Sequence, residues 1–296
     1  MNNADQLLVG YGKADITPLG PVPLGGYGNG LHRISTSVSD PIFATCIAMT
    51  DRENNTVVLF GIDYNGTGGP VFRQLRKELA QELGLRLENV IFSASHMHSS
   101  PDLWLKHEGI EAYIPVLAKG LREAAAMALA DRAPAQLAIG SIQTQRLNFV
   151  RRYELEGGRF VGYESDIKES GLAVVGHESD ADGQLQLLAF QRSGKEEILL
   201  ANFQVHPHRG GGSKNTTVTA DLVGVFRNKV AETLGCHVIY ITGGSGNVNP
   251  YSALKHEHVT ANYIEQGNAL ADYALKAHHS PRRGAGRNHQ NCHADL

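Results

Sequence analysis

The chain has 296 residues, of which 42% are hydrophobic and 19% charged, and its formal net charge is −3. This composition is typical of a globular protein with a sizeable core, and the charge excludes a global field that would recruit nucleic acid. Three cysteines without CxxC spacing argue against a disulfide framework and a thiolate metal site. No window approaches the ~18 apolar residues of a membrane helix, and the start has no signal-peptide pattern. We therefore expect a cytoplasmic protein with no nucleic-acid partner and no stable membrane insertion; the oligomeric state stays open.

The first part of the chain predicts strands, a loop and a helix. Residues 7–17 form a short apolar run, and the Gly- and Pro-rich stretch 18–32 is predicted to be loop. Two β-rich runs, 41–50 and 56–63, surround a polar turn and predict a hairpin. Apolar residues at helical spacing then predict a helix over 71–83.

The rest of the chain alternates in the same way. The predicted strands are 89–95, 135–142, 171–176, 185–192, 197–206 and 237–242, and the predicted helices are 113–129, 219–234 and 259–277. This order predicts one α/β domain over 1–277, with mixed β-sheets packed in layers and flanking helices. Residues 278–296, rich in His, Arg and Gly, read as a disordered tail.

Two His-x-His pairs are the main chemical signals. His96 and His98 directly follow the predicted strand 89–95, and His206 and His208 end the predicted strand 197–206. Residues two apart on extended backbone point to the same side, so each pair can face one cavity. Zinc is commonly bound by imidazole and needs three or four ligands, which two strands can supply together. The alternative is that one pair or both are solvated or structural.

Other polar residues have two open interpretations each. Asp221 opens a predicted helix and is either its N-cap or a site residue, and Asp63 at a strand end is similarly ambiguous. The adjacent Arg151 and Arg152 either are solvated or orient a carbonyl or carboxylate. The loop GGSGNVNP (243–250) can present N–H donors to an oxyanion, but it lacks the G-x-S-x-G pattern of a serine hydrolase.

Several segments together resemble the N-terminal catalytic domain of the neutral/alkaline non-lysosomal ceramidases. The resemblance covers residues 8 to 276. Its segments are VGYGKADITP (9–18), LGGY (24–27), DP (40–41), the strand ending in Asp63, SHMHSSP (95–101), VHP (205–207), AD (220–221) and GNVNP (246–250).

This resemblance implies a zinc-dependent amidase that hydrolyses the amide of a small N-acyl substrate. It implies that His96 and His206 bind Zn²⁺, that His98 faces the substrate, and that Arg151, or less surely Arg152, holds it. Asp221 and Asn249 lie in the matching segments and complete the expected catalytic set with His98 and Arg151.

The chain also departs from the family pattern. The ceramidases carry an Asp and a Ser in the loop that here reads GNVNP, and a glutamate and a tyrosine ligand well downstream of the second histidine, for which no match follows His206. The chain therefore resembles a shortened member, incomplete on its C-terminal side. The alternative function is a catalytically inactive or regulatory metal-binding domain. A third possibility, incidental histidines, predicts that His96 and His206 lie far apart.

Overall fold

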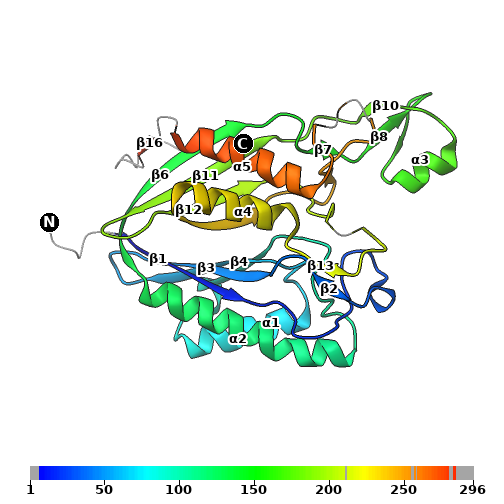
Figure 1. Ribbon diagram of the computed structural model, residues 1–296. Helices are drawn as coiled ribbons and strands as arrows, with labels where there is room; N and C mark the ends of the chain where they lie inside the picture. The colour runs from blue at the N-terminus through cyan, green and yellow to red at the C-terminus, as the bar shows by residue number, and fades with distance from the viewer. Residues whose placement is uncertain (1–6, 211, 255–256, 258, 280–282, 285–296) are drawn as a thin grey trace.

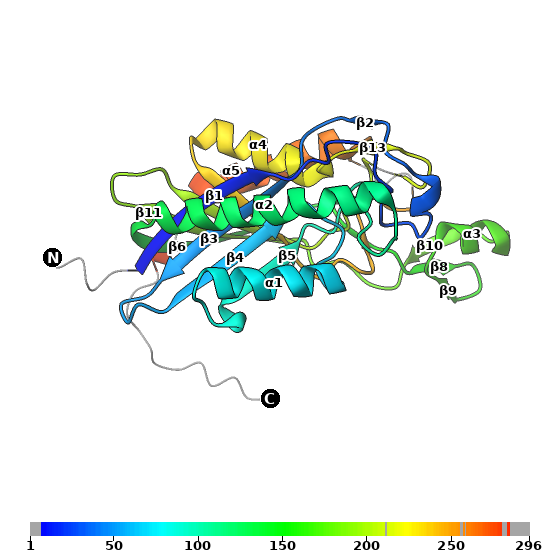
Figure 2. The same cartoon turned by 90° about the horizontal axis from the view of Figure 1, so that it is seen from below.

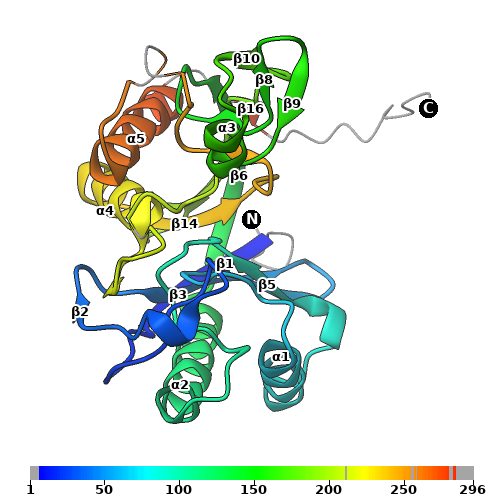
Figure 3. The same ribbon diagram turned by 90° about the vertical axis from the view of Figure 1, so that its right-hand side faces the viewer.

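The computed structural model describes residues 7–210, 212–254, 257, 259–279 and 283–284. Two halves of one large sheet pack face to face, and each half carries a pair of helices on its outer side (Figure 1). Figure 3, which looks from the right-hand side of Figure 1, shows these four layers one above the other. The predicted class, mixed sheets in layers with flanking helices, is confirmed.

The first half contains the N-terminal elements and the second half most of the later ones. The first half consists of β1 (Leu7–Asp15), β3 (Phe43–Thr50), β4 (Thr56–Ile62) and β5 (Val90–Ala94), covered by α1 (Pro70–Glu82) and α2 (Glu108–Ala130). Figure 2 shows both of these helices across this half from below. The second half consists of β6 (Ala133–Gln143), β11 (Gln184–Arg192), β12 (Ile198–Phe203) and β14 (His237–Thr242), covered by α4 (Asp221–Leu234) and α5 (Tyr263–His279).

The sheet folds over where its two halves join. Its strand order is β14-β12-β11-β6-β1-β3-β4-β5, and the short β16 (Arg283–Gly284) also pairs with β6. Only three residue pairs, Leu7–Val9 with Ala133–Ala135, connect β1 to β6, so the two halves can stack on each other. An apolar cluster that includes Ile47 and Ile239 fills the space between them. Burial of these side chains from both halves is the main force holding them together.

Close packing of α2 on β1 depends on two glycines in the first predicted strand. A Cβ on Gly10 would lie 2.1 Å from the carbonyl oxygen of Ala128, and one on Gly12 would lie 2.0 Å from that of Ala124. Any side chain at these positions would push the helix off the sheet. The two glycines of the VGYGKAD segment therefore serve packing.

A small lobe, residues 149–177, extends from one end of the layers (Figure 1). It contains β7 (Phe149–Val150), β8 (Tyr153–Leu155), β9 (Arg159–Val161), α3 (Glu164–Ser170) and β10 (Val174–His177). Its own small core includes Tyr153, Leu155 and Val161. β7 pairs with β15 (Val248–Asn249), which ties the lobe to the loop after β14. The remaining short elements are β2 (Ser37–Val38), β13 (Thr217–Val218) and the 3₁₀ turns η2 (Gly30–His32) and η3 (Leu87–Asn89).

Element types agree with the sequence analysis, but several boundaries differ. β12 ends at Phe203, so His206 lies beyond the strand and not at its end. α2 begins five residues earlier than expected, where the side chain of His107 caps the helix by accepting the N–H of Gly109. Within the expected disordered tail, His278 and His279 are the last residues of α5, and Arg283–Gly284 form β16. The other residues of that tail, 280–282 and 285–296, lie outside the described part. No helix among the described residues is long and apolar enough to cross a membrane.

Candidate metal and substrate site

His96 is held by the backbone that follows β4. The backbone φ of His96 is 66°, in the left-handed region that is uncommon for residues other than glycine. This backbone conformation turns the side chain away from the path of the preceding strand. Its backbone N–H donates to the carbonyl of Tyr64 at 2.8 Å, and ring Nδ1 lies 2.6 Å from the carbonyl oxygen of Asn65. Because a carbonyl only accepts, Nδ1 carries the proton, and Nε2 is left with a free lone pair.

His206 is held in the same manner from the other half of the sheet. Its backbone N–H donates to Val248 at 2.9 Å, and ring Nδ1 lies 3.2 Å from the carbonyl oxygen of Ser245. The proton is again on Nδ1, so Nε2 of His206 carries a lone pair, and Nε2 of His98 lies 2.7 Å from it. A backbone carbonyl that fixes the tautomer is the usual second contact of a metal-binding histidine.

The stacked halves bring these two histidines together. β4 and β5 are parallel, as are β12 and β14, and Thr242 Oγ1 at the end of β14 donates to the carbonyl of Ser95 at 2.7 Å. The ring centroids of His96 and His206 are 4.4 Å apart. The interpretation in which these two histidines lie far apart is therefore wrong.

His98 is the third ring of this group. One nitrogen from each of His96, His98 and His206 lies within 4.8 Å of the others, so the three can hold a metal ion. Nε2 of His98 is 2.7 Å from Nε2 of His206. Unlike the other two rings, His98 has no carbonyl on Nδ1, which is buried and without a hydrogen-bond partner among the described residues.

The backbone at Gly26 makes room for the His98 ring. Gly26 has a φ of +106°, and a Cβ there would lie 2.4 Å from Cγ of His98. Tyr27 follows and packs its ring edge-to-face with His98, at 4.8 Å between centroids. The buried Arg33 donates from its guanidinium to the backbone carbonyl of His98 at 2.9 Å. This explains why the LGGY segment accompanies the first histidine pair.

Burial keeps the central imidazoles neutral. It lowers the pKa of His98 to about 2, with a further contribution from His206 and its other histidine neighbours. It lowers the pKa of His206 to about 3, again with help from neighbouring histidines. Neutral rings with fixed tautomers offer lone pairs without first losing a proton, so the donor set fits a borderline-soft divalent ion such as zinc.

His208, whose role the sequence left unassigned, stands beside this group. Its ring centroid is 4.8 Å from that of His206, and its Nε2 lies 3.1 Å from Oδ1 of Asn249. The hydroxyl of Tyr27 donates to the backbone carbonyl of His208 at 3.0 Å. Asn249, predicted as a site residue, thus faces the group and orients His208.

Arg151 and Arg152 have different surroundings. Arg151 lines the cavity in front of the histidines, and its guanidinium carbon lies 5.1 Å from the ring centroid of Tyr163. Arg152 forms a half-exposed ion pair with Glu178 at 2.8 Å and does not line that cavity. Of the two, only Arg151 is in a position to contact a substrate.

Asp221 supports the site from behind. It is buried with a φ of 54°, and its two carboxylate oxygens accept the N–H groups of Leu222 and Gly210, each at 2.6 Å. Burial raises its pKa to about 6, against the lowering effect of these two N–H donors. It is absent from the cavity wall; as the first residue of α4 it accepts the N–H of the next residue and, through Gly210, holds the segment after His208.

Asp63 has a structural role. Its carboxylate binds the guanidinium of Arg227 in α4 through two hydrogen bonds, 2.9 and 2.6 Å long, and both side chains are almost fully buried. It also accepts the backbone N–H of Phe43 at 2.9 Å. This pair joins β4 to the helix of the other half.

The site opens into a cavity of about 1040 Å³ between the histidines and the small lobe. His98, His206, His208, Arg151 and Asn249 all line it. The glycines of the loop 243–250 do not, so the predicted oxyanion role of that loop has no support in the geometry. Its carbonyl at Ser245 instead orients His206.

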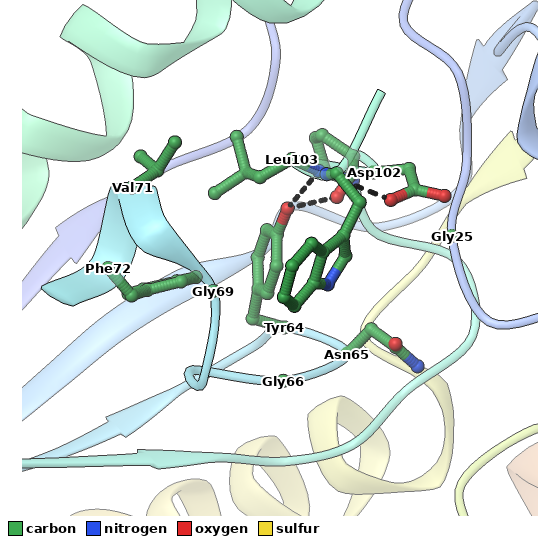
Figure 4. Close-up of a pocket in the computed structure, with 11 residues that line it drawn as sticks. Gly25, Tyr64, Asn65, Gly66, Gly69, Val71, Phe72, Asp102 and Leu103 are labelled. Atoms are coloured by element: carbon green, nitrogen blue, oxygen red, sulfur yellow. Dashed lines mark hydrogen bonds between the residues drawn. The ribbon is translucent and has the colours of Figure 1, made fainter. Parts of the chain in front are cut away.

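A second hollow, lined by Tyr64, Asn65 and Leu103 among others, is too small for substrate, at about 20 Å³ (Figure 4). The hydroxyl of Tyr64 donates there to the carbonyl of Pro101 and accepts the N–H of Leu103 at 3.1 Å. This space is roughly that of one water molecule. These contacts hold the turn that follows His98 in place.

The groups that orient the histidines were not predicted from the sequence. The carbonyls of Asn65 and Ser245 are backbone atoms, and no residue type signals them. Tyr163 and Tyr251, which line the cavity, come from the small lobe and from the loop after β15. A lone tyrosine in a loop carries no pattern that would have identified it.

No protein-family description and no curated protein sequence matches the chain. Solved structures do match the chain. The neutral ceramidase from Pseudomonas aeruginosa superposes with a TM-score of 0.74 over 92% of this chain, at 19% identity. The fold is that of the neutral ceramidases. A second structure, described as ceramidase complexed with C2, also has a TM-score of 0.74, 19% identity and 92% coverage. The chain spans 45% and 44% of the lengths of these two ceramidases.

Proposed function

We propose that the chain forms the metal-binding part of a zinc-dependent hydrolase that cleaves the amide bond of an N-acyl substrate. One observation carries the proposal: His96 and His206 each have Nδ1 on a backbone carbonyl, so their Nε2 atoms carry lone pairs within the three-histidine group, and His206 also lines a large cavity. The likeness to ceramidases, which are named for an amide substrate, ceramide, supports the choice of bond.

In this proposal His96 and His206 are metal ligands. When bound, zinc polarises the amide carbonyl as a Lewis acid and lowers the pKa of a coordinated water toward ~7. Hydrolysis breaks the C–N bond, and water supplies a hydroxyl to the acyl carbon and a proton to the amine. His98, which lines the cavity, faces the substrate and carries a proton between these groups. Arg151 orients the substrate from the opposite wall.

The second candidate is a metal-binding domain without turnover. The 2.7 Å approach of His98 to His206 favours it, because His98 can then serve as a third ligand and not as a substrate contact. A ring held by the metal could not also carry a proton to or from the substrate. The two candidates therefore differ in what His98 does.

The experiment measures zinc content and amine release from a panel of N-acyl compounds, with zinc added. Wild type should carry zinc and release amine, whereas His96→Ala and His206→Ala should lose both. His32→Ala, which removes an exposed histidine far along the chain from both pairs, is the control. Equal zinc in all four proteins would show that the site is elsewhere, and zinc without amine release would favour the second candidate.

A further inference from the structure

The walls of the large cavity are unusual for a protein with the fold of a lipid amidase. The described residues that line it include tyrosines, histidines, serines, asparagines and two arginines, but no Leu, Ile, Val, Met or Phe. Among the described residues, its aliphatic side chains are those of Ala253 and Ala261, and four tyrosine rings supply further apolar surface. A long acyl chain gains roughly 0.8 kcal/mol for each buried CH₂, and only where apolar surface covers it. The tyrosine rings can cover a short acyl group, whereas the described wall forms no aliphatic tunnel for a long one.

One cation in the wall is left without a counter-charge. Among the described residues, the guanidinium of Arg151 forms no ion pair and no side-chain hydrogen bond, and its only side-chain partner is the ring of Tyr163. Its backbone is fixed, because its N–H donates to the carbonyl of Asn247 at 2.8 Å. The side chain is therefore anchored at its base, with its charged end at the cavity.

The other charged groups of the wall are engaged. Arg209 donates to Thr260 Oγ1 at 2.9 Å and to the carbonyls of Thr260 and Ala261. Glu164 hydrogen-bonds the hydroxyl of Tyr251. Among the described residues of the wall, Arg151 alone has a guanidinium without a hydrogen-bond partner, and such a planar fork matches a single carboxylate in a two-point contact.

We propose, resting on the hydrolase function above, that the substrate is a short-chain N-acyl compound whose carboxylate pairs with Arg151. The amide then lies between this carboxylate and the histidine group. A short acyl part, such as an acetyl group, needs no apolar tunnel. N-acylated amino acids are the simplest compounds of this class, and long-chain neutral amides are disfavoured.

Matched substrates test the charge. N-acetylalanine and its carboxamide differ only in the carboxylate, and N-palmitoylalanine tests chain length. Wild type should hydrolyse N-acetylalanine with the highest kcat/KM of the three. Arg151→Gln should raise KM for N-acetylalanine by about 10- to 100-fold and raise KM for the carboxamide by a smaller factor. Arg151→Lys should recover part of the loss.

Arg152→Gln is the matched control, because Arg152 is the next residue and is paired with Glu178 outside the cavity. It should behave like wild type toward all three compounds. Circular dichroism and the urea midpoint of each variant check that a loss of binding does not come from misfolding.

Binding without turnover separates this inference from the proposed function. Titration calorimetry of N-acetylalanine against zinc-free protein should show binding that Arg151→Gln weakens about 10-fold or more and Arg152→Gln does not. Such binding without amine release would contradict the hydrolase and leave the carboxylate site standing. Preferred hydrolysis of the carboxamide or the palmitoyl compound, unaffected by Arg151→Gln, would overturn the carboxylate site and leave the hydrolase standing.

Discussion

Nδ1 of His96 lies 2.6 Å from the carbonyl oxygen of Asn65, and this contact has a counterpart between His206 and Ser245 at 3.2 Å. His98 has no such contact. Because a fixed tautomer is what distinguishes a preformed ligand from a mobile ring, the three histidines are not equivalent. The predictions below follow from that difference and from the contacts that support it.

His98→Ala should keep its zinc and lose turnover. If His98 faces the substrate, its removal leaves both anchored ligands in place and takes away a proton carrier, which is typically worth about 10²- to 10⁴-fold in rate. Zinc per chain and kcat are measured on the same preparation. Loss of zinc comparable with that of His206→Ala would identify His98 as a ligand instead.

Gly26→Ala should disturb His98 specifically. The new Cβ would lie 2.4 Å from the His98 ring, at a φ of +106° that L residues rarely adopt, so the ring must move. We expect turnover to fall at least tenfold. Gly28→Ala is the control, since Gly28 also has a positive φ, of 71°, but a Cβ there meets nothing within 4 Å. Equal losses in both variants would mean that backbone strain, not the ring contact, is responsible.

Asp221 should make stability depend on pH in a particular direction. Its pKa is about 6 in the folded protein against 3.8 as reference, so the folded state holds the proton more tightly than the unfolded state. Stability from this group is therefore fully present below pH ~4 and is lost as pH rises through about 6, by about 3 kcal/mol. Asp221→Asn cannot ionise and should gain about this much relative to wild type between pH 4 and 7. Urea unfolding at both pH values measures it; a pH-independent difference would contradict the assignment.

Breaking the buried pair between Asp63 and Arg227 should destabilise the fold. Removing the arginine alone, as Arg227→Met, leaves a buried carboxylate uncompensated and should cost about 3–5 kcal/mol in unfolding free energy. The double variant Asp63→Asn with Arg227→Met has no buried charge and keeps an acceptor for the Phe43 N–H, so it should recover much of the loss. Urea denaturation of both proteins decides, and a cost below about 1 kcal/mol for Arg227→Met would show that the pair contributes little.

Much of the fold was predictable because local patterns carry it. The hairpin of β3 and β4 and the helices α1 and α4 appear where alternating or helical apolar spacing predicts them. The start of α2 was predicted five residues late. The residue that caps this helix is His107, whose ring accepts the N–H of Gly109, and histidine is not among the residue types that indicate a helix start.

By itself, the sequence determined which segments are strands and helices and that a His-x-His pair follows each of two of them, since these are properties of neighbouring residues. Only the tertiary structure decided that β5 and β12 end on the same side of two stacked sheet halves, which brings His96 to His206. It likewise decided that Arg151 faces the cavity while Arg152 binds Glu178, and that Asp63 is structural. The physical reason is that a side chain's partners depend on contacts between residues from tens to more than a hundred positions apart, and hydrophobic periodicity holds no information about those contacts.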